Sequence, residues 1–173
     1  MKVCVRVMLI IASGIFETLI GSARASPGDA DQRADVEAVI RASGTAFAAL
    51  DCAAVDAYFA PGARWIEGDY PQSNESTAWC KQARSAGLRM TFDLHDFEIR
   101  VLGSVAWATV VVDGHFYAGT PEARALLGHG VHDPAEWLAT MIDSVVLRKT
   151  GKVWLIVLEH RSLIPPKIKK SDG

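Results

Sequence analysis

The sequence lacks any apolar run long enough to cross a membrane, because its longest one, from Val7 to Phe16, is far shorter than a spanning helix needs. It also lacks an excess of one charge: 18 Lys and Arg face 20 Asp and Glu, for a net charge of −2. Without a basic stripe, nucleic acid is not an expected partner. The chain contains no nucleophile elbow, no P-loop and no dinucleotide fingerprint, which excludes those enzyme classes.

Cysteine is scarce, with three in the chain. Cys4 lies in an N-terminal segment that we expect to be removed, which leaves Cys52 and Cys80. These two form either a disulfide or a pair of buried free thiols. A bridge would tie the first helical region to the third helix and contribute about 3 kcal/mol.

The N-terminus predicts a signal peptide over residues 1–25. Lys2 and Arg6 give a basic start, an apolar core follows, and Ala23-Arg24-Ala25 is a small-x-small cleavage site. The alternative is an N-terminal helix packed on the domain. We therefore expect an exported protein, periplasmic or secreted, with no membrane association once the signal is removed.

The length of the remaining chain is typical of one domain. Residues 26–31 are small and polar and predict a loose leader, residues 32–165 the domain, and residues 166–173 a flexible basic tail. No internal repeat is present.

Helical periodicity predicts a first helix from Gln32. Its apolar stripe consists of Val36, Val39, Ile40, Phe47 and Leu50. A short second helix is expected over residues 52–59, capped by Asp51 and ended by Pro61-Gly62. A third is expected from its cap at Asn74 to Gly87.

Strand periodicity governs the second half. A short strand is expected at residues 63–67, and long strands at 88–101 and 105–118. Apolar positions change phase near His95-Asp96, which predicts a β-bulge. An irregular insertion at 119–135 contains a helical turn at 122–127, and a hairpin at 137–161 turns at Thr150-Gly151. The order predicts an α+β fold, in which a curved antiparallel sheet forms a cone with N-terminal helices packed over it around an internal pocket.

Two blocks of the sequence carry a family resemblance. They are AFAALDCAAVDAYFAPGARW at residues 46–65 and SVVLRKTGKVWLIVLEHRS at residues 144–162. In both, the chain resembles the nuclear transport factor 2-like superfamily, also called SnoaL-like or ketosteroid isomerase-like. That superfamily includes ketosteroid isomerases, scytalone dehydratases, polyketide cyclases, limonene epoxide hydrolases and non-catalytic binding modules. The resemblance implies a cone-shaped fold and a homodimer through the sheet.

The resemblance also implies positions for three groups. Glu67 falls close to the general-base Asp of the ketosteroid isomerases, and Asp143 falls where they hold a protonated Asp that donates to an oxyanion. The tyrosine that completes that oxyanion hole would sit near Ala46 and is absent.

Asp143 is the leading candidate on the residues themselves. It shares a strand face with Trp137, Ala139, Met141, Val145 and Leu147. An acid in such surroundings should be desolvated, with a raised pKa, so that it donates a hydrogen bond or acts as a base near neutral pH. The alternative is a structural Asp bonded to the backbone or an Arg, or one that faces a dimer interface.

Three further titratable residues have both a functional and a structural interpretation. Glu67, beside Trp65, is either a general base across the cavity or an acid on the rim. His115, with Asp113, Tyr117 and Trp107, lies either in the pocket or on an outward-facing edge strand. His160 shares a predicted strand face with Trp154, Ile156 and Leu158, and it is either a ligand-binding residue or a residue of the core or an interface. Glu159 lies on the opposite predicted face.

Aromatic residues would supply the wall of an apolar cavity, although some of them must belong to the core. The predicted ligand-binding residues are Trp65, Trp79, Trp107, Phe116, Trp137, Met141 and His160. His129, His132 and Asp133 fit no standard zinc spacing, so no metal and no cofactor is expected.

The sequence thus predicts an exported protein that binds a small hydrophobic molecule. Asp143, with Glu67 or His115, would catalyse proton-transfer chemistry of the isomerase or lyase type, namely isomerisation, dehydration or cyclisation. The alternative is a non-catalytic dimeric module with a vestigial pocket.

Overall fold

The computed structural model describes residues 27–67, 70–72, 76–130 and 132–164. The predicted signal peptide and the predicted C-terminal tail lie outside the described residues. Within the described ranges, no helix combines the length and the apolarity that crossing a membrane requires.

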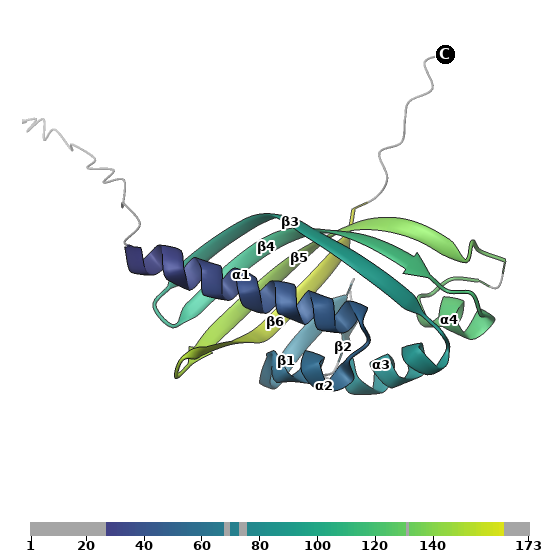
Figure 1. Cartoon of the computed structure of the whole chain (residues 1–173), viewed down its shortest axis with the longest axis horizontal. Helices are drawn as coiled ribbons and strands as arrows, with labels where there is room; N and C mark the ends of the chain where they lie inside the picture. The colour runs from purple at the N-terminus through teal and green to yellow at the C-terminus, as the bar shows by residue number, and fades with distance from the viewer. Residues whose placement is uncertain (1–26, 68–69, 73–75, 131, 165–173) are drawn as a thin grey trace, which may run out of the picture.

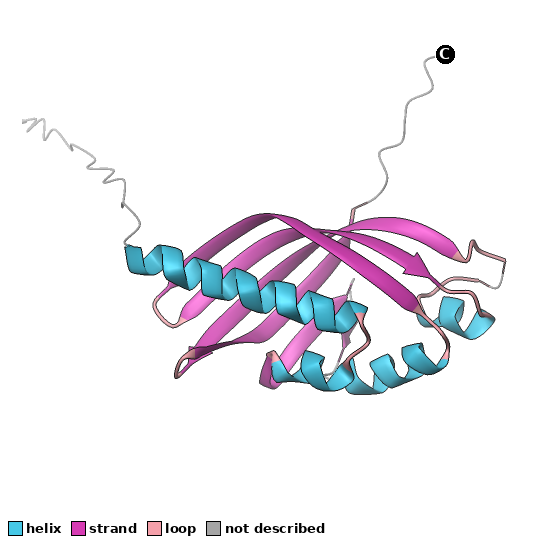
Figure 2. Cartoon of the chain, in the orientation of Figure 1, coloured by secondary structure: helices cyan, strands magenta, loops and turns pink. Residues whose placement is uncertain are grey.

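The helices of the described residues gather on one side of a curved sheet (Figures 1 and 2). They are α1 (Pro27–Ala48), α2 (Cys52–Ala57), α3 (Ser76–Ser85) and α4 (Pro121–Leu126). The long helix α1 lies across the sheet and packs mainly against β3 (Arg89–Leu102). Asp51 accepts a hydrogen bond from the amide of Ala54, so it caps α2 as its sequence predicts.

The sheet contains six strands within the described residues, in the order β2-β1-β6-β5-β4-β3. Besides β3, they are β1 (Phe59–Glu67), β2 (Tyr70–Gln72), β4 (Val105–Tyr117), β5 (Glu136–Thr150) and β6 (Val153–Leu163). Four long strands form an antiparallel succession, which confirms the predicted α+β cone. Helices therefore cover one face of the sheet, and the opposite face is not covered by any described helix (Figure 2).

A β-bulge bends β3 at the predicted position. The register of β3 against β4 shifts between His95 and Glu98, and Asp96 has a φ of 53°. Short polar side chains such as Asp tolerate this left-handed conformation better than most residues. The bulge increases the local twist, which lets the sheet curve around its contents.

The core lies between α1 and the concave face of the sheet. On β4, alternate residues from Ala106 to Phe116 are buried, and the predicted stripe of α1 supplies buried Val36, Ile40 and Phe47. On β5, Met141, Asp143, Val145 and Leu147 are buried, as their alternation predicts.

Several predicted boundaries were wrong. Helix α1 begins at Pro27 rather than Gln32, so residues 27–31 belong to a helix and not to a loose leader. A proline is well suited to a first helical position, because its φ is already helical and its missing N–H would have no intrahelical partner.

Strand β1 begins at Phe59, not at residue 63, and passes through Pro61-Gly62 with a register shift. It pairs in parallel with β6, so the sheet is mixed and not purely antiparallel. Parallel pairing needs a long crossover connection, which the chain between β1 and β6 supplies. The helical turn expected at 122–127 is confirmed as α4.

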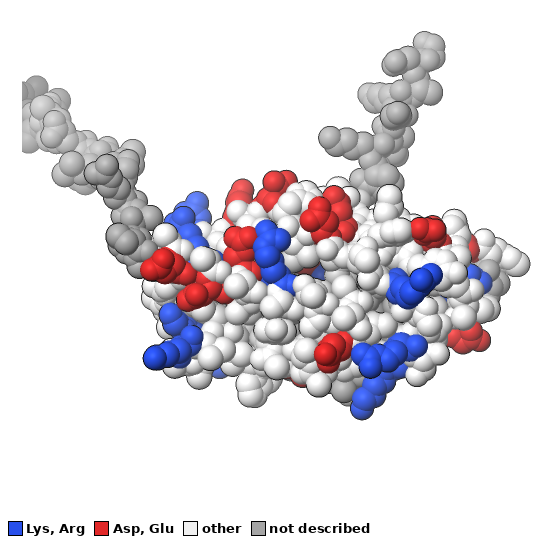
Figure 3. All heavy atoms as spheres, viewed as in Figure 1, with Lys and Arg blue, Asp and Glu red and all other residues white. Residues whose placement is uncertain are grey.

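Charged side chains are interspersed on the face shown in Figure 3, where Lys and Arg alternate with Asp and Glu without a basic stripe. This distribution fits the balanced composition of the chain.

Candidate active site in the cone

A cavity lies inside the cone between α1 and the concave face of the sheet. Its volume is about 30 Å³, which is room for one or two water molecules. It is lined mostly by apolar and aromatic side chains, and by four buried polar ones: Ser43, Asp143, Glu159 and Arg161.

Arg161 joins two acids at the polar side of this cavity. Its Nε and Nη2 donate to the two carboxylate oxygens of Asp143 at 2.8 and 2.7 Å. Its Nη2 also lies 3.4 Å from Oε1 of Glu159. Exposed fractions of 5% for Asp143, 9% for Glu159 and 8% for Arg161 show that all three are buried. Buried charges persist where they are paired, and a bidentate guanidinium–carboxylate contact is the strongest such pair.

A second β-bulge turns Glu159 and Arg161 inward. Val146 pairs with Leu158, but its neighbour Leu147 pairs with Ile156, so Val157 is an extra residue in β6. Alternation therefore reverses after Val157, and Asp143 faces Arg161 across the ladder.

This bulge corrects the predicted face of His160. Strict alternation places it beside Trp154 and Ile156, but the structure pairs His160 with Ser144, on the opposite side of the sheet from Asp143. Glu159, which the sequence assigned to the other face, lines the cavity instead.

Aromatic rings surround the guanidinium. Its carbon lies 5.8 Å from the ring centre of Phe47, 5.7 Å from that of Trp65 and 5.6 Å from that of Phe92. Phe47 stacks on Trp79 and Phe92 with ring centres 5.2 and 5.9 Å apart, and meets Trp65 edge-on at 5.0 Å. Cation–π attraction at such distances stabilises a charge that is shielded from water.

Trp65 also presents an unsatisfied donor. Its indole Nε1 is buried and finds no hydrogen-bond acceptor among the described residues, although its side chain lines the cavity. Leaving a buried donor without an acceptor costs about 1–3 kcal/mol. An oxygen atom of a small molecule in the cavity would satisfy this N–H.

Other predicted residues lie near the cavity without lining it. Phe116 and Met141 are buried in the adjoining core, and Phe116 stacks on Trp137 with ring centres 5.6 Å apart. Trp79 is partly buried and stacks on Phe47, which lines the cavity.

Two predicted residues lie on the outer face of the sheet. Trp107 is 39% exposed, and His115 is exposed with its Nε2 2.5 Å from Oε1 of Glu136. His115, Asp113, Tyr117 and Trp107 do share one face, but it is the face that points away from the cavity. Of Glu67 the structure describes only the backbone, which pairs with Arg161, so its role stays a prediction.

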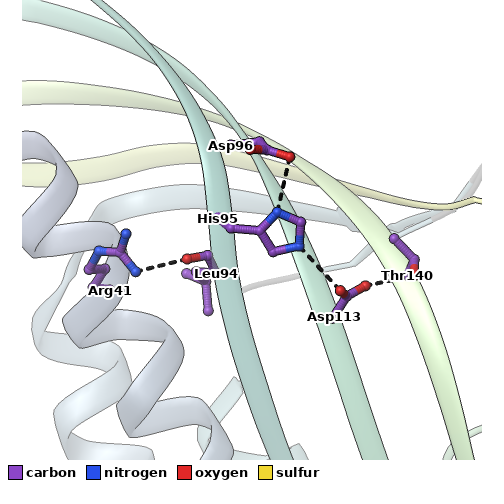
Figure 4. A network of polar contacts seen from close by, with 6 residues as sticks. All are labelled: Arg41, Leu94, His95, Asp96, Asp113 and Thr140. Atoms are coloured by element: carbon purple, nitrogen blue, oxygen red, sulfur yellow. Dashed lines mark hydrogen bonds and ion pairs between the residues drawn. The ribbon is translucent and has the colours of Figure 1, made fainter.

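His95 forms a second polar network on the outer face (Figure 4). Its Nδ1 lies 3.1 Å from Asp96 and its Nε2 lies 3.2 Å from Asp113, to which Thr140 donates at 2.7 Å. Hydrogen bonds to Asp96 and then Asp113 raise the pKa of His95. Hydrogen bonds from Thr140 and then His95 lower the pKa of Asp113. The network holds the β3 bulge against β4 and β5, away from the cavity.

Cys52 and Cys80 carry free thiols in the structure. Burial, followed by a hydrogen bond to Cys52, raises the pKa of Cys80 to about 12. Among the described residues, no group of three or more His, Cys, Asp or Glu is arranged to hold a metal ion.

The family of the chain follows from a comparison of its sequence with known families. The SnoaL-like domain family matches residues 36–166, and the chain belongs to it. A comparison with curated proteins finds no match.

Solved structures share the fold at low sequence identity. A protein of unknown function from Mycobacterium tuberculosis superposes with a TM-score of 0.64 at 11% identity, over 80% of this chain and 76% of that one. A proposed dehydratase of the NTF2-like family from Streptomyces avermitilis gives 0.61 at 14% identity, over 78% and 97%. A ketosteroid isomerase-like protein from Erwinia carotovora atroseptica gives 0.58 at 18% identity, over 79% and 98%. These similarities establish the nuclear transport factor 2-like fold and nothing about the substrate.

Proposed function

We propose that the protein binds a small, mainly apolar molecule in the cone and moves a proton on it without a cofactor. The observation that carries the proposal is the buried group of Asp143, Arg161 and Glu159 in a cavity otherwise lined largely by apolar side chains. Burying such a group costs free energy that an apolar core would not, so chemistry is a reason for its presence.

The two acids differ in how Arg161 holds them, and this difference suggests their roles. Both oxygens of Asp143 accept hydrogen bonds from Arg161, so this carboxyl group is fully engaged in holding the guanidinium. Glu159 meets the same guanidinium at a longer distance, 3.4 Å. We therefore assign proton transfer to Glu159 and the positioning of Arg161 to Asp143. Trp65 would donate its indole N–H to an oxygen of the substrate.

The reaction class remains the one that the sequence suggests: isomerisation, dehydration or cyclisation. Structural neighbours named as a proposed dehydratase and as ketosteroid isomerase-like support this class by fold alone. Since the cavity holds about 30 Å³, any larger substrate must displace side chains such as Phe47 and Phe92.

Native mass spectrometry of the purified protein before and after denaturation tests the proposal. We expect a small mass that is lost on denaturation, and reduced occupancy in Glu159→Gln. Glu98→Gln, which changes an exposed acid outside the cavity, should keep the wild-type occupancy. Equal occupancy in both variants would remove Glu159 from the site, and a wild-type protein of bare chain mass would count against a binding function.

A second candidate function is that of a dimeric interaction module. The outer face of the sheet exposes Leu138 by 79%, Ile142 by 39% and Trp107 by 39%. Apolar side chains gathered on one face are typical of a protein–protein contact, and a second copy of the chain would cover them. Light scattering should then give a dimer for the wild type and a monomer for Leu138→Glu. If the wild type and Leu138→Glu are both monomeric, this face has no role in assembly.

Export is part of the proposal, and its support is the pattern of residues 1–25. Expression of the full-length chain should yield exported protein whose intact mass begins at Ser26. Exported protein that still begins at Met1 would contradict cleavage.

A further inference from the structure

A groove on the outside of the molecule is much larger than the cavity in the cone. It has a volume of about 710 Å³, within the range of small-molecule sites, and lies where the end of α1, the end of α3 and the starts of β3 and β5 meet. Buried Leu50, Leu88 and Met90 contribute apolar surface to it. It shares no lining residue with the cone cavity.

Cationic side chains dominate its polar rim. Arg84 and Arg89 face one acid, Glu136, which is already bonded to His115 at 2.5 Å. Arg84 donates to the backbone carbonyl of Leu50. Arg89 lies over the ring of Tyr117 at 4.1 Å and forms no ion pair with any described residue. The guanidinium of Arg89 is therefore held in place by an aromatic face, while its N–H groups have no carboxylate partner in the described part of the chain.

We propose that this groove binds an organic carboxylate with an apolar body. The apolar part would lie against Leu50, Leu88 and Met90, and the carboxylate would accept hydrogen bonds from Arg89 and Arg84. Arg is the side chain best suited to a carboxylate, because its planar donors match both oxygens. The proposal is independent of the function proposed for the cone.

A matched pair of probes tests it: 1-naphthoate, and 1-naphthylmethanol as the neutral analogue with the same rings. Calorimetry should show that naphthoate binds more tightly than the alcohol, and more weakly as salt is raised. Arg89→Met should weaken naphthoate about tenfold and leave the alcohol unchanged. Arg100→Met, an exposed arginine near the other end of β3, should change neither.

Two further variants keep the test informative if Arg89→Met is unstable. Glu136→Gln should strengthen naphthoate binding, because it removes the acid of the rim, and Asp143→Asn should leave it unchanged, because that acid belongs to the cone. The inference is overturned if the wild type does not bind naphthoate saturably, if Arg100→Met weakens it as much as Arg89→Met, or if Arg89→Met alters the oligomeric state and not the affinity.

Discussion

Arg161→Met is the substitution that tests the buried charges most directly. Methionine keeps a long, flexible side chain in the cavity but removes the donors that hold Asp143 and Glu159. Removing one partner of a buried ion pair costs about 3–5 kcal/mol, because the other charge stays buried without compensation. That is a large part of the roughly 5–15 kcal/mol by which a domain of this size is stable. We expect the free energy of unfolding to fall by about 3–5 kcal/mol.

Urea unfolding followed by tryptophan fluorescence measures this loss. With a slope of about 1–3 kcal/mol per molar urea, the midpoint should fall by at least about 1 M. Arg148→Met is the control, because Arg148 is exposed on the outer face of β5 and should cost less than about 0.5 kcal/mol.

A double variant separates the lost ion pair from lost packing. Arg161→Met with Asp143→Leu removes both partners of the bidentate pair, and apolar replacement of a buried pair is often neutral. The double variant should therefore regain much of the stability that Arg161→Met alone loses. A loss below about 1 kcal/mol in the single variant, or a double variant no more stable than the single one, would refute a buried and energetically coupled pair.

Three other predictions concern residues outside the cavity. Hydrogen bonds to Asp96 and Asp113 raise the pKa of His95 in the folded protein, so they stabilise the fold when His95 is protonated. This stabilisation is fully present below the pKa of His95 in the unfolded chain, about 6.5, and is lost as the pH rises through the pKa in the folded protein. His95→Gln should abolish this part of the pH dependence of the free energy of unfolding. Gly114→Ala should lower the free energy of unfolding, measured by a thermal melt, by about 1–3 kcal/mol, because the added Cβ would lie 2.6 Å from Phe116 and 2.9 Å from Met141. Gly130→Ala is the control and should cost little, because its added Cβ would lie 3.6 Å from Asp133, an ordinary contact distance. If the thiols are free in the isolated protein, Cys80 should react with a thiol reagent only on unfolding, since burial raises its pKa to about 12; a thiol titration of unreduced, denatured protein that finds neither Cys52 nor Cys80 would instead show a disulfide.

The fold was largely predictable because its signals are local. The period of α1, the alternation on β4 and β5, and the phase change at His95 each follow from residues close together in the sequence. The parallel pairing of β1 with β6 was not predictable in this way. It joins segments that lie far apart in the chain, and no local pattern encodes it.

The site was less predictable than the fold, and the reason lies in one residue of β6. Counting back from the turn, where Thr150 pairs with Val153, an unbroken hairpin would place Asp143 opposite His160. The bulge at Val157 places it opposite Arg161 instead. One signal was available: a buried carboxylate requires a partner, and Arg161 is the residue near this register that is always charged.

Deleting Val157 should remove the bulge and reverse which side chains of one half of β6 face the core. Either Glu159 and Arg161 turn outward, or Trp154 and Ile156, which are 2% and 1% exposed, leave the core. Both outcomes should cost at least about 3 kcal/mol in urea unfolding. Val157→Ala keeps the residue count and trims a side chain that is only partly buried, so it should cost less than half as much. Adding Arg161→Met to the deletion distinguishes the two outcomes: little further loss means that Arg161 has turned outward, and the full loss means that the pair survives and the core has opened. A deletion variant as stable as Val157→Ala would show that the extra residue does not determine which side chains enter the cavity.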